Sequence, residues 1–321
     1  WLLAIAQGLF LANNVTFIAI NGLVGLSLAP YPWMATLPVM GYVVGGALST
    51  GLVAASQRRW GRKLSFQLGL LVALLSAVMG ILAVQSQSFW LLVSTTLVAG
   101  YYSANGHLYR FAAAELTEIS QREKAVSLVM AGGLIGAVIG PNLASHTRSW
   151  LEMPFAGAYL ALALLALISL TLVSQINFPP VPERNKLTGG RSNVDLLLQP
   201  VFAVAVLAAS VSYGVMNLLM AATPLAMQVC SMPFEQTALV LEWHVIGMFA
   251  PGFVTGHLIR RFGVLTIMGV GVILNLVCIA IALSGTDLQH FIAALFLLGV
   301  GWNFLFTGST TLSLDAYRPE E

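Results

Sequence analysis

Two pairs of soft metal donors, each with a spacing of four residues, lie in the second half of the chain. Met216 and Met220 form a Met-x-x-x-Met pair in one apolar stretch, and His244 and Met248 form a His-x-x-x-Met pair in the next. Residues four apart share one face of a helix, so each pair can direct two donor atoms to a common point. Thioether sulfur is a soft ligand and imidazole a borderline one, which favours Cu(I) over Mg²⁺ or Ca²⁺. We therefore interpret these four side chains as candidate copper ligands, with flexible core packing as the alternative for the methionines.

A second group of sulfur atoms follows the first methionine pair. It consists of Met227, Cys230 and Met232, close to the expected outer end of the stretch. A cation that arrives from outside would meet these sulfurs before the deeper pair, so we expect an outer-mouth capture step. The alternative is an ordinary turn before Pro233. Cys278 lies in the middle of another apolar run, where a small buried hydrophobic residue is expected.

Several polar side chains within apolar runs are candidates for the cavity or for proton coupling. Glu242 is the one carboxylate clearly inside a span of the second half, and intramembrane acids usually face water or a partner. The others are His107, Asn13, Asn14, Asn105 and Asn303. The asparagines suit either contact with an organic substrate or hydrogen bonds between helices. A neutral, hydrogen-bonded state is the alternative for the histidine.

The elements that position these residues must lie in a membrane. Of 321 residues, 58% are hydrophobic and 8% are charged, whereas roughly a quarter of an average soluble domain is charged. Apolar runs long enough to cross about 30 Å of hydrocarbon recur along nearly the whole chain. Barrel strands would instead alternate apolar and polar residues in short segments. The composition predicts an all-α, polytopic membrane protein.

We expect about ten membrane spans. They cover residues 2–28, 33–56, 64–84, 89–114, 124–147, 154–175, 200–226, 235–257, 264–284 and 289–313. A polar stretch at 176–199, rich in Pro, Gly and charge, is expected to be a linker. This divides the chain into an N-terminal half of six helices (1–175), a cytoplasmic linker (176–199) and a C-terminal half (200–321).

The basic residues predict the orientation, because Lys and Arg accumulate in cytoplasmic loops. All but one of the 14 Lys and Arg residues fall on one side of a ten-span arrangement: Arg58, Arg59, Arg62, Lys63, Arg110, Arg122, Lys124, Arg184, Lys186, Arg191, Arg260, Arg261 and Arg318. Only Arg148 falls on the other side. We therefore expect a cytoplasmic N-terminus.

A repeat relates the two halves. MGYVVGGALSTGLVAASQRRWGRK (40–63) and IGMFAPGFVTGHLIRRFG (246–263) are both Gly-rich and both contain Arg-Arg-aromatic-Gly at the end of the second span of their half. Two parallel six-helix repeats are therefore expected. The second half has four expected spans, so we expect two further helices to be missing after residue 321. Because residue 1 already lies in an apolar run, the N-terminus is expected to have been trimmed.

The motif SQRRWGRK (56–63) resembles the G-x-L-x-D-R-x-G-R-K loop of major-facilitator transporters, except that Arg58 stands at the acidic position. GGLIGAVIGP (132–141) is similar to the Gly-rich element of the fifth helix in antiporters of that superfamily, with close helix packing as the alternative. The resemblance implies transport by alternating access between the two halves.

The combination of Met216, Met220, His244 and Met248 on consecutive helices resembles the CcoA family of bacterial copper importers. That resemblance implies copper as substrate at these residues, a bacterial cytoplasmic (inner) membrane and delivery to cytochrome oxidase assembly, with a copper chaperone as a downstream partner. We expect a monomer in the lipid bilayer, without a tightly bound cofactor.

Other functions stay open. Related transporters of the same subfamily carry riboflavin, so an organic solute is one alternative, and a drug:proton antiporter is another. An enzyme is not expected, because no nucleophile–base pair or phosphate loop is found. Nucleic-acid binding is not expected with a net charge of +2.

Overall fold

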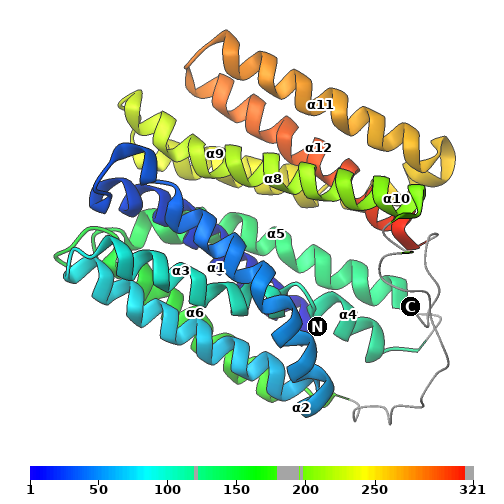
Figure 1. Ribbon diagram of the computed structural model, residues 1–321, viewed down its shortest axis with the longest axis horizontal. Coiled ribbons are helices and arrows are strands. Elements are labelled where there is room, and N and C mark those ends of the chain that lie inside the picture. The colour runs from blue at the N-terminus through cyan, green and yellow to red at the C-terminus, as the bar shows by residue number, and fades with distance from the viewer. Residues whose placement is uncertain (119–121, 179–194, 196–197, 315–321) are drawn as a thin grey trace. The chain divides into compact units, whose positions relative to one another are not determined.

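The computed structural model describes residues 1–118, 122–178, 195 and 198–314. Every element of regular structure in these ranges is a helix (Figure 1). The elements are α1 (Leu2–Leu28), the short 3₁₀ helix η1 (Pro32–Met34), α2 (Leu37–Gln85), α3 (Phe89–Gly106), α4 (Tyr109–Glu115), α5 (Arg122–Thr147), α6 (Ala156–Ser174), α8 (Pro200–Val229), α9 (Phe234–Phe249), α10 (Gly252–Phe262), α11 (Val264–Ser284) and α12 (Leu288–Leu314). The all-α prediction is confirmed.

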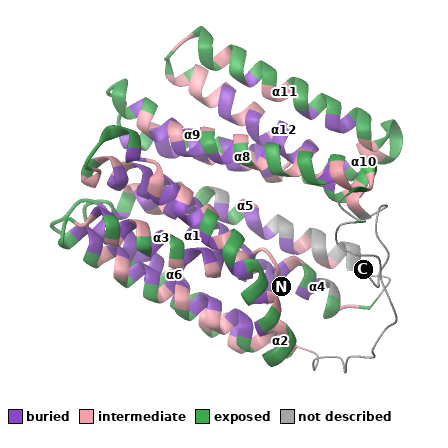
Figure 2. Ribbon diagram, viewed as in Figure 1, coloured by how far each residue is buried: buried purple, intermediate pink, exposed green. Residues whose placement is uncertain are grey.

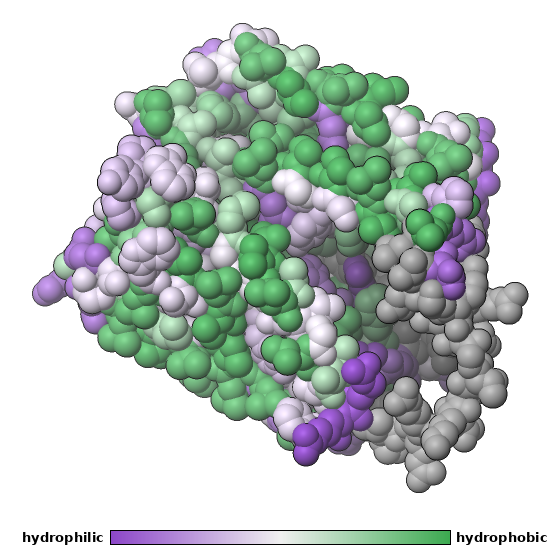
Figure 3. Space-filling view, in the orientation of Figure 1, coloured by the Kyte–Doolittle hydropathy of each residue, from purple (hydrophilic) through white to green (hydrophobic). Residues whose placement is uncertain are grey.

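Many of these helices suit a bilayer rather than water. Within the described residues, six helices are long and apolar enough to cross a membrane, and the bent pair α9–α10, with an angle of 41°, would make a seventh. Large apolar side chains are exposed along α11, where Leu265, Ile273 and Leu276 are 64%, 59% and 60% exposed. Much of this helix has the colour of exposed residues in Figure 2. Figure 3 shows hydrophobic side chains over wide areas of the surface. Such a surface suits lipid rather than water. The full count of ten spans stays a prediction.

The two Arg-Arg-aromatic-Gly copies have similar backbone turns. Helix α2 is broken at Gly61, whose φ is 81° and ψ 171°, so its 49 residues correspond to two expected spans. Gly263, with φ 87° and ψ 150°, separates α10 from α11 in the same way. Positive φ is readily adopted only by glycine. The shared sequence motif thus ends in the same kind of turn in both halves.

Contacts divide the chain into two compact units. The first comprises Trp1–Val181 and Ala221–Glu242, and the second comprises Pro182–Met220 and Trp243–Glu321. The C-terminal end of α8 and the start of α9 therefore group with the N-terminal helices, whereas the sequence-based halves would divide the chain at the linker. Most of that linker, including Arg184, Lys186 and Arg191, lies outside the described residues, as does Arg318.

The Gly-rich element of α5 packs against α1 in the first unit. A Cβ at Gly132 would meet the carbonyl of Ala4, and a Cβ at Gly136 would lie 2.6 Å from the carbonyl oxygen of Gly8. Small residues spaced by four let membrane helices approach this closely. Close packing therefore explains the spacing of these glycines.

Aromatic side chains mark one end of the first unit. Tyr31 and Trp33 flank the start of α2 and stack on each other, with ring centroids 6.5 Å apart. Trp90 at the start of α3 and Trp150 after α5 are 61% and 57% exposed. Trp and Tyr concentrate at membrane–water interfaces, so we assign this end to one interface.

Candidate substrate site

His244 combines complete burial with one unused ring nitrogen. Its side chain is 0% exposed, and Nδ1 lies 2.8 Å from the carbonyl oxygen of Leu295 on α12. A carbonyl can only accept, so Nδ1 carries the hydrogen and donates it. In the neutral ring, Nε2 then presents a lone pair. Nε2 is buried and has no hydrogen-bond partner among the described residues, so this acceptor is left unused in this part of the chain.

Close packing of α9 on α12 holds this imidazole in place. A Cβ at Gly247 would lie 2.6 Å from the carbonyl oxygen of Phe296. A Cβ at Gly299 would meet the carbonyl of His244 and lie 2.8 Å from the amide nitrogen of Met248. The two glycines allow the two backbones to approach, which brings Leu295 within reach of the histidine ring.

Asn303 connects α12 to the break between α9 and α10. Its Nδ2 donates to the carbonyl of Met248 at 2.7 Å, and its Oδ1 accepts from Thr255 Oγ1 at 2.7 Å. Helix breaks leave carbonyls without their usual partners, which side chains then satisfy. The polar groups of Asn303 therefore serve a structural bridge in this conformation.

Met216 and Met220 lie on one face of α8 and are 4% and 3% exposed. Met248 is 7% exposed. All four candidate copper ligands belong to the second unit. Among the described residues, no three His, Cys, Asp or Glu side chains converge as a metal site. A metal site here would therefore depend on methionine sulfur.

An aromatic cluster in the second unit was not predicted as part of the site. Trp302 stacks on Phe306 with centroids 4.8 Å apart and an interplanar angle of 13°. Tyr213 of α8 lies 6.3 Å from the Trp302 ring, and Phe249 of α9 lies at the same distance. The indole Nε1 is buried and has no hydrogen-bond partner among the described residues. The i, i+4 spacing of Trp302 and Phe306 is the signal that could have identified this pair.

The predicted polar residues of the first unit have different environments. Asn105 accepts from Ser65 Oγ at 2.9 Å and donates to the Tyr101 carbonyl at 3.2 Å, so it bridges α2 and α3. His107 is half-buried, with its ring 5.3 Å from that of Phe10. Asn13 and Asn14 are buried in α1, at 6% and 8% exposure.

The remaining candidates also fall in the first unit. Glu242 is half-buried and accepts from Asn142 Nδ2 at 3.2 Å. Met227 is 0% exposed, whereas Cys230 is exposed as a free thiol and Met232 is half-buried. The three sulfur side chains thus have unlike exposures, and outer-mouth capture by them stays a prediction.

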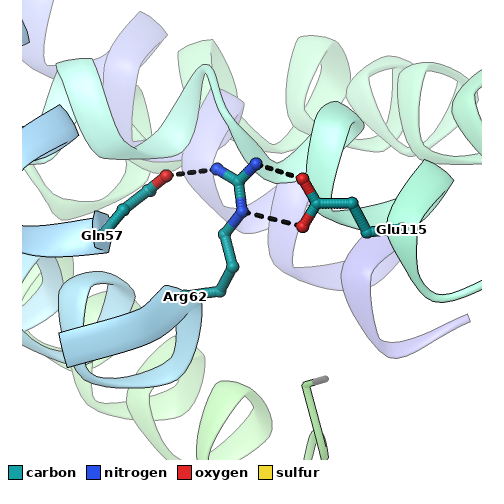
Figure 4. Close-up of polar contacts among 3 residues, drawn as sticks. All are labelled: Gln57, Arg62 and Glu115. Atoms are coloured by element: carbon teal, nitrogen blue, oxygen red, sulfur yellow. Dashed lines mark hydrogen bonds and ion pairs between the residues drawn. The ribbon is translucent and has the colours of Figure 1, made fainter. Parts of the chain in front are cut away.

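Arg62 of the SQRRWGRK motif is held by a carboxylate from another helix. It donates to both oxygens of Glu115 at the end of α4, with an Nε–Oε2 distance of 3.0 Å, and also to Gln57 Oε1 (Figure 4). Bidentate guanidinium–carboxylate pairs fix geometry strongly. Glu115 thus supplies a carboxylate to a motif that has Arg58 at the acidic position.

Relatives of known sequence match all or most of the chain. A protein of Brucella anthropi named riboflavin transporter RfnT is 38% identical over 323 residues, which cover 100% of this chain and 81% of that protein. The uncharacterized transporter YddS of Bacillus subtilis, of the major-facilitator type, is 27% identical over 305 residues, covering 89% of this chain and 70% of its own.

Solved structures share the fold. The nucleoside transporter NupG superposes with a TM-score of 0.72 at 11% identity, covering 99% of this chain and 83% of its own. A D-xylose–proton symporter gives 0.68 at 14% identity, covering 98% and 85%. At these identities the likeness concerns the fold alone.

The model of the Major Facilitator Superfamily matches residues 1–321. Together with the all-helical fold, this supports a multi-pass membrane transporter rather than an enzyme. The chain belongs to the Major Facilitator Superfamily.

Proposed function

We propose that this chain transports riboflavin or a closely similar organic solute across the membrane. The observation that carries the proposal is its 38% identity, along its whole length, to a protein named as a riboflavin transporter. Copper import, the main expectation from the Met and His pairs, has no support from these relatives. We therefore prefer the organic solute.

The chemistry of the second unit suits a flavin. The isoalloxazine of riboflavin is planar and aromatic, and its imide N–H lies between two carbonyls. The Trp302–Phe306 stack offers apolar ring faces of this kind. The free Trp302 Nε1 can donate to a carbonyl, and the free His244 Nε2 can accept from the imide N–H. Buried hydrogen-bonding groups discriminate between substrates. An analogue that lacks the carbonyl or the imide N–H would leave Trp302 Nε1 or His244 Nε2 without a partner.

The test is uptake of radiolabelled riboflavin by riboflavin-auxotrophic cells that express the protein. His244→Ala should reduce uptake at least about tenfold at equal membrane abundance, because it removes a buried hydrogen-bond acceptor. His257→Ala, at an exposed histidine of α10, is the matched control and should leave uptake unchanged. If cells with the wild-type protein accumulate no more riboflavin than cells with an empty vector, the proposal is wrong.

Import of Cu(I) is the second candidate, and the state of His244 favours it. Metal-binding histidines commonly donate their other ring N–H to a backbone carbonyl, as Nδ1 does to Leu295. Met216→Leu separates the candidates, because leucine retains the packing volume and removes the sulfur. The flavin proposal predicts nearly normal riboflavin uptake in this variant, whereas the copper proposal predicts loss of copper uptake.

The proposed location is the bacterial cytoplasmic membrane with a cytoplasmic N-terminus, as the basic residues predict. The two halves, 1–175 and 200–321, would alternate in exposing the substrate site to either side of the membrane. A copper chaperone and cytochrome oxidase assembly would be relevant only under the copper candidate.

A further inference from the structure

A cavity of about 480 Å³ lies in the first unit, apart from the residues of the proposed flavin site. It is lined by the C-terminal end of α1, the α2–α3 connection, the α5–α6 connection and the segment from α8 to α9. Small-molecule sites usually measure about 300–1,000 Å³. The basic-residue distribution predicts that these connections lie on the outer side of the membrane.

Arg148 is the positively charged residue that lines this cavity, and its side chain contacts two aromatic rings. Its guanidinium carbon lies 5.0 Å from the ring centroid of Phe155 and 5.7 Å from that of Phe234. The rings accept no conventional hydrogen bond, so the five N–H donors of the guanidinium can serve oxygen acceptors. Arg148 forms no ion pair with a described carboxylate, so its charge is not neutralised by the side chains around it.

The backbone around the cavity adopts costly conformations. Three non-glycine residues have positive φ in the described part of the chain: Gln87 at 52°, Phe155 at 68° and Ser231 at 58°. Gln87 and Phe155 line the cavity, and Ser231 directly precedes the lining residue Met232. A hydrogen bond of 2.8 Å from the Phe155 amide to the Arg148 carbonyl closes the turn that places ring and cation together. Strained backbone of this kind gathers at ligand-binding sites.

We propose that this Arg148 cavity is a second, outer binding site that captures a planar conjugated solute through its carbonyl or anionic oxygens. The in-plane N–H groups of Arg148 donate to those oxygens, while Phe155 and Phe234 contact the apolar part of the ring system. The inference rests on the proposed function, since riboflavin has this chemistry. It adds a site in the first unit to the contacts of His244 and Trp302 in the second.

The test measures how uptake depends on the external riboflavin concentration. Arg148→Gln should raise the half-saturating concentration about tenfold, the effect of losing hydrogen bonds from a charged donor. The maximal rate should stay within about twofold, since the second-unit contacts are intact. Arg148→Lys should also raise it, because lysine lacks the planar fork. Arg260→Gln, at an exposed arginine of α10, is the control and should match the wild type.

Each result has a distinct meaning. If the wild type transports riboflavin and Arg148→Gln has an unchanged half-saturating concentration, the outer site is refuted and the proposed function stands. A loss of maximal rate alone would also refute it, since Arg148 would then serve the transport cycle rather than binding. Wild-type affinity in Arg148→Lys would overturn the proposed role of the planar guanidinium in binding the solute. Absence of wild-type uptake would overturn both proposals.

Discussion

The packing of α9 on α12 can be tested by adding one methyl group. In Gly299→Ala the new Cβ would lie 2.8 Å from the Met248 amide nitrogen and 3.0 Å from the Gly247 carbonyl carbon. Ordinary contact between such atoms is about 3.5 Å. The obstacles are backbone atoms, which cannot rotate away as a side chain would. The helices must therefore separate, and the bond between His244 Nδ1 and the Leu295 carbonyl must lengthen.

Overpacking of this kind costs about 1–3 kcal/mol, against which the better helix propensity of Ala returns up to about 1 kcal/mol. We expect the melting temperature of the purified protein in detergent to lie about 2–6 °C below that of Gly214→Ala, which gains the same helix propensity without the clash. Riboflavin uptake should fall as well, since His244 moves with the backbone. The matched control is Gly214→Ala in α8 of the same unit, where a Cβ meets nothing within 4 Å. Equal melting temperatures for the two variants would refute the close approach of α9 and α12.

Three further substitutions test other contacts. Asn303→Leu leaves the Met248 carbonyl and the Thr255 hydroxyl without this partner, and should destabilise the protein by about 1–3 kcal/mol; unchanged thermal unfolding would contradict the bridge. Glu115→Gln removes the charge that Arg62 binds at a half-exposed position. The free energy of unfolding should fall by at most about 1 kcal/mol, and by less at high salt. A loss of stability that does not depend on salt would contradict an ionic role. Trp302→Phe keeps an aromatic ring beside Phe306 but deletes the free Nε1 donor. Riboflavin binding, measured by flavin fluorescence quenching, should weaken about fivefold with little change in stability. An unchanged affinity would show that the indole is not part of the site.

Much of the fold could be predicted, because the apolar runs indicate where helices form and the glycines indicate where the chain can turn. The span boundaries predicted between residues 56 and 64 and between residues 257 and 264 contain Gly61 and Gly263, where the chain turns with a positive φ that suits glycine. The Gly-rich stretch of α5 left open whether it packs or serves transport, and its contacts with Ala4 and Gly8 of α1 show packing.

The candidate site was less predictable. The spacing of residues along a helix shows which side chains share a face, but not which residues of other helices that face contacts. The four-residue spacing of His244 and Met248 is equally compatible with metal binding and with packing. Only the Leu295 carbonyl, on a helix 51 residues further along, determines which ring nitrogen is free. Asn105 and Asn303 were predicted to face a cavity or bridge helices, and their hydrogen bonds favour bridging. Trp302 was missed, because its i, i+4 spacing from Phe306 is also what ordinary packing within an apolar helix produces.

The substrate is the part of the account that residue types leave most open. Soft donors favour Cu(I) on chemical grounds, yet methionines also fill space in apolar cores without binding a metal. A relative with 38% identity carries more information on the substrate than two short motifs do.

Transport by the purified protein in proteoliposomes tests the central claim most directly. Radiolabelled riboflavin and Cu(I) would be offered side by side, with Met216→Leu and His244→Ala as companions to the wild type. We predict riboflavin uptake by the wild type and by Met216→Leu, reduced uptake by His244→Ala, and no copper uptake above that of empty vesicles. Copper uptake that both substitutions abolish, without any riboflavin uptake, would contradict the account.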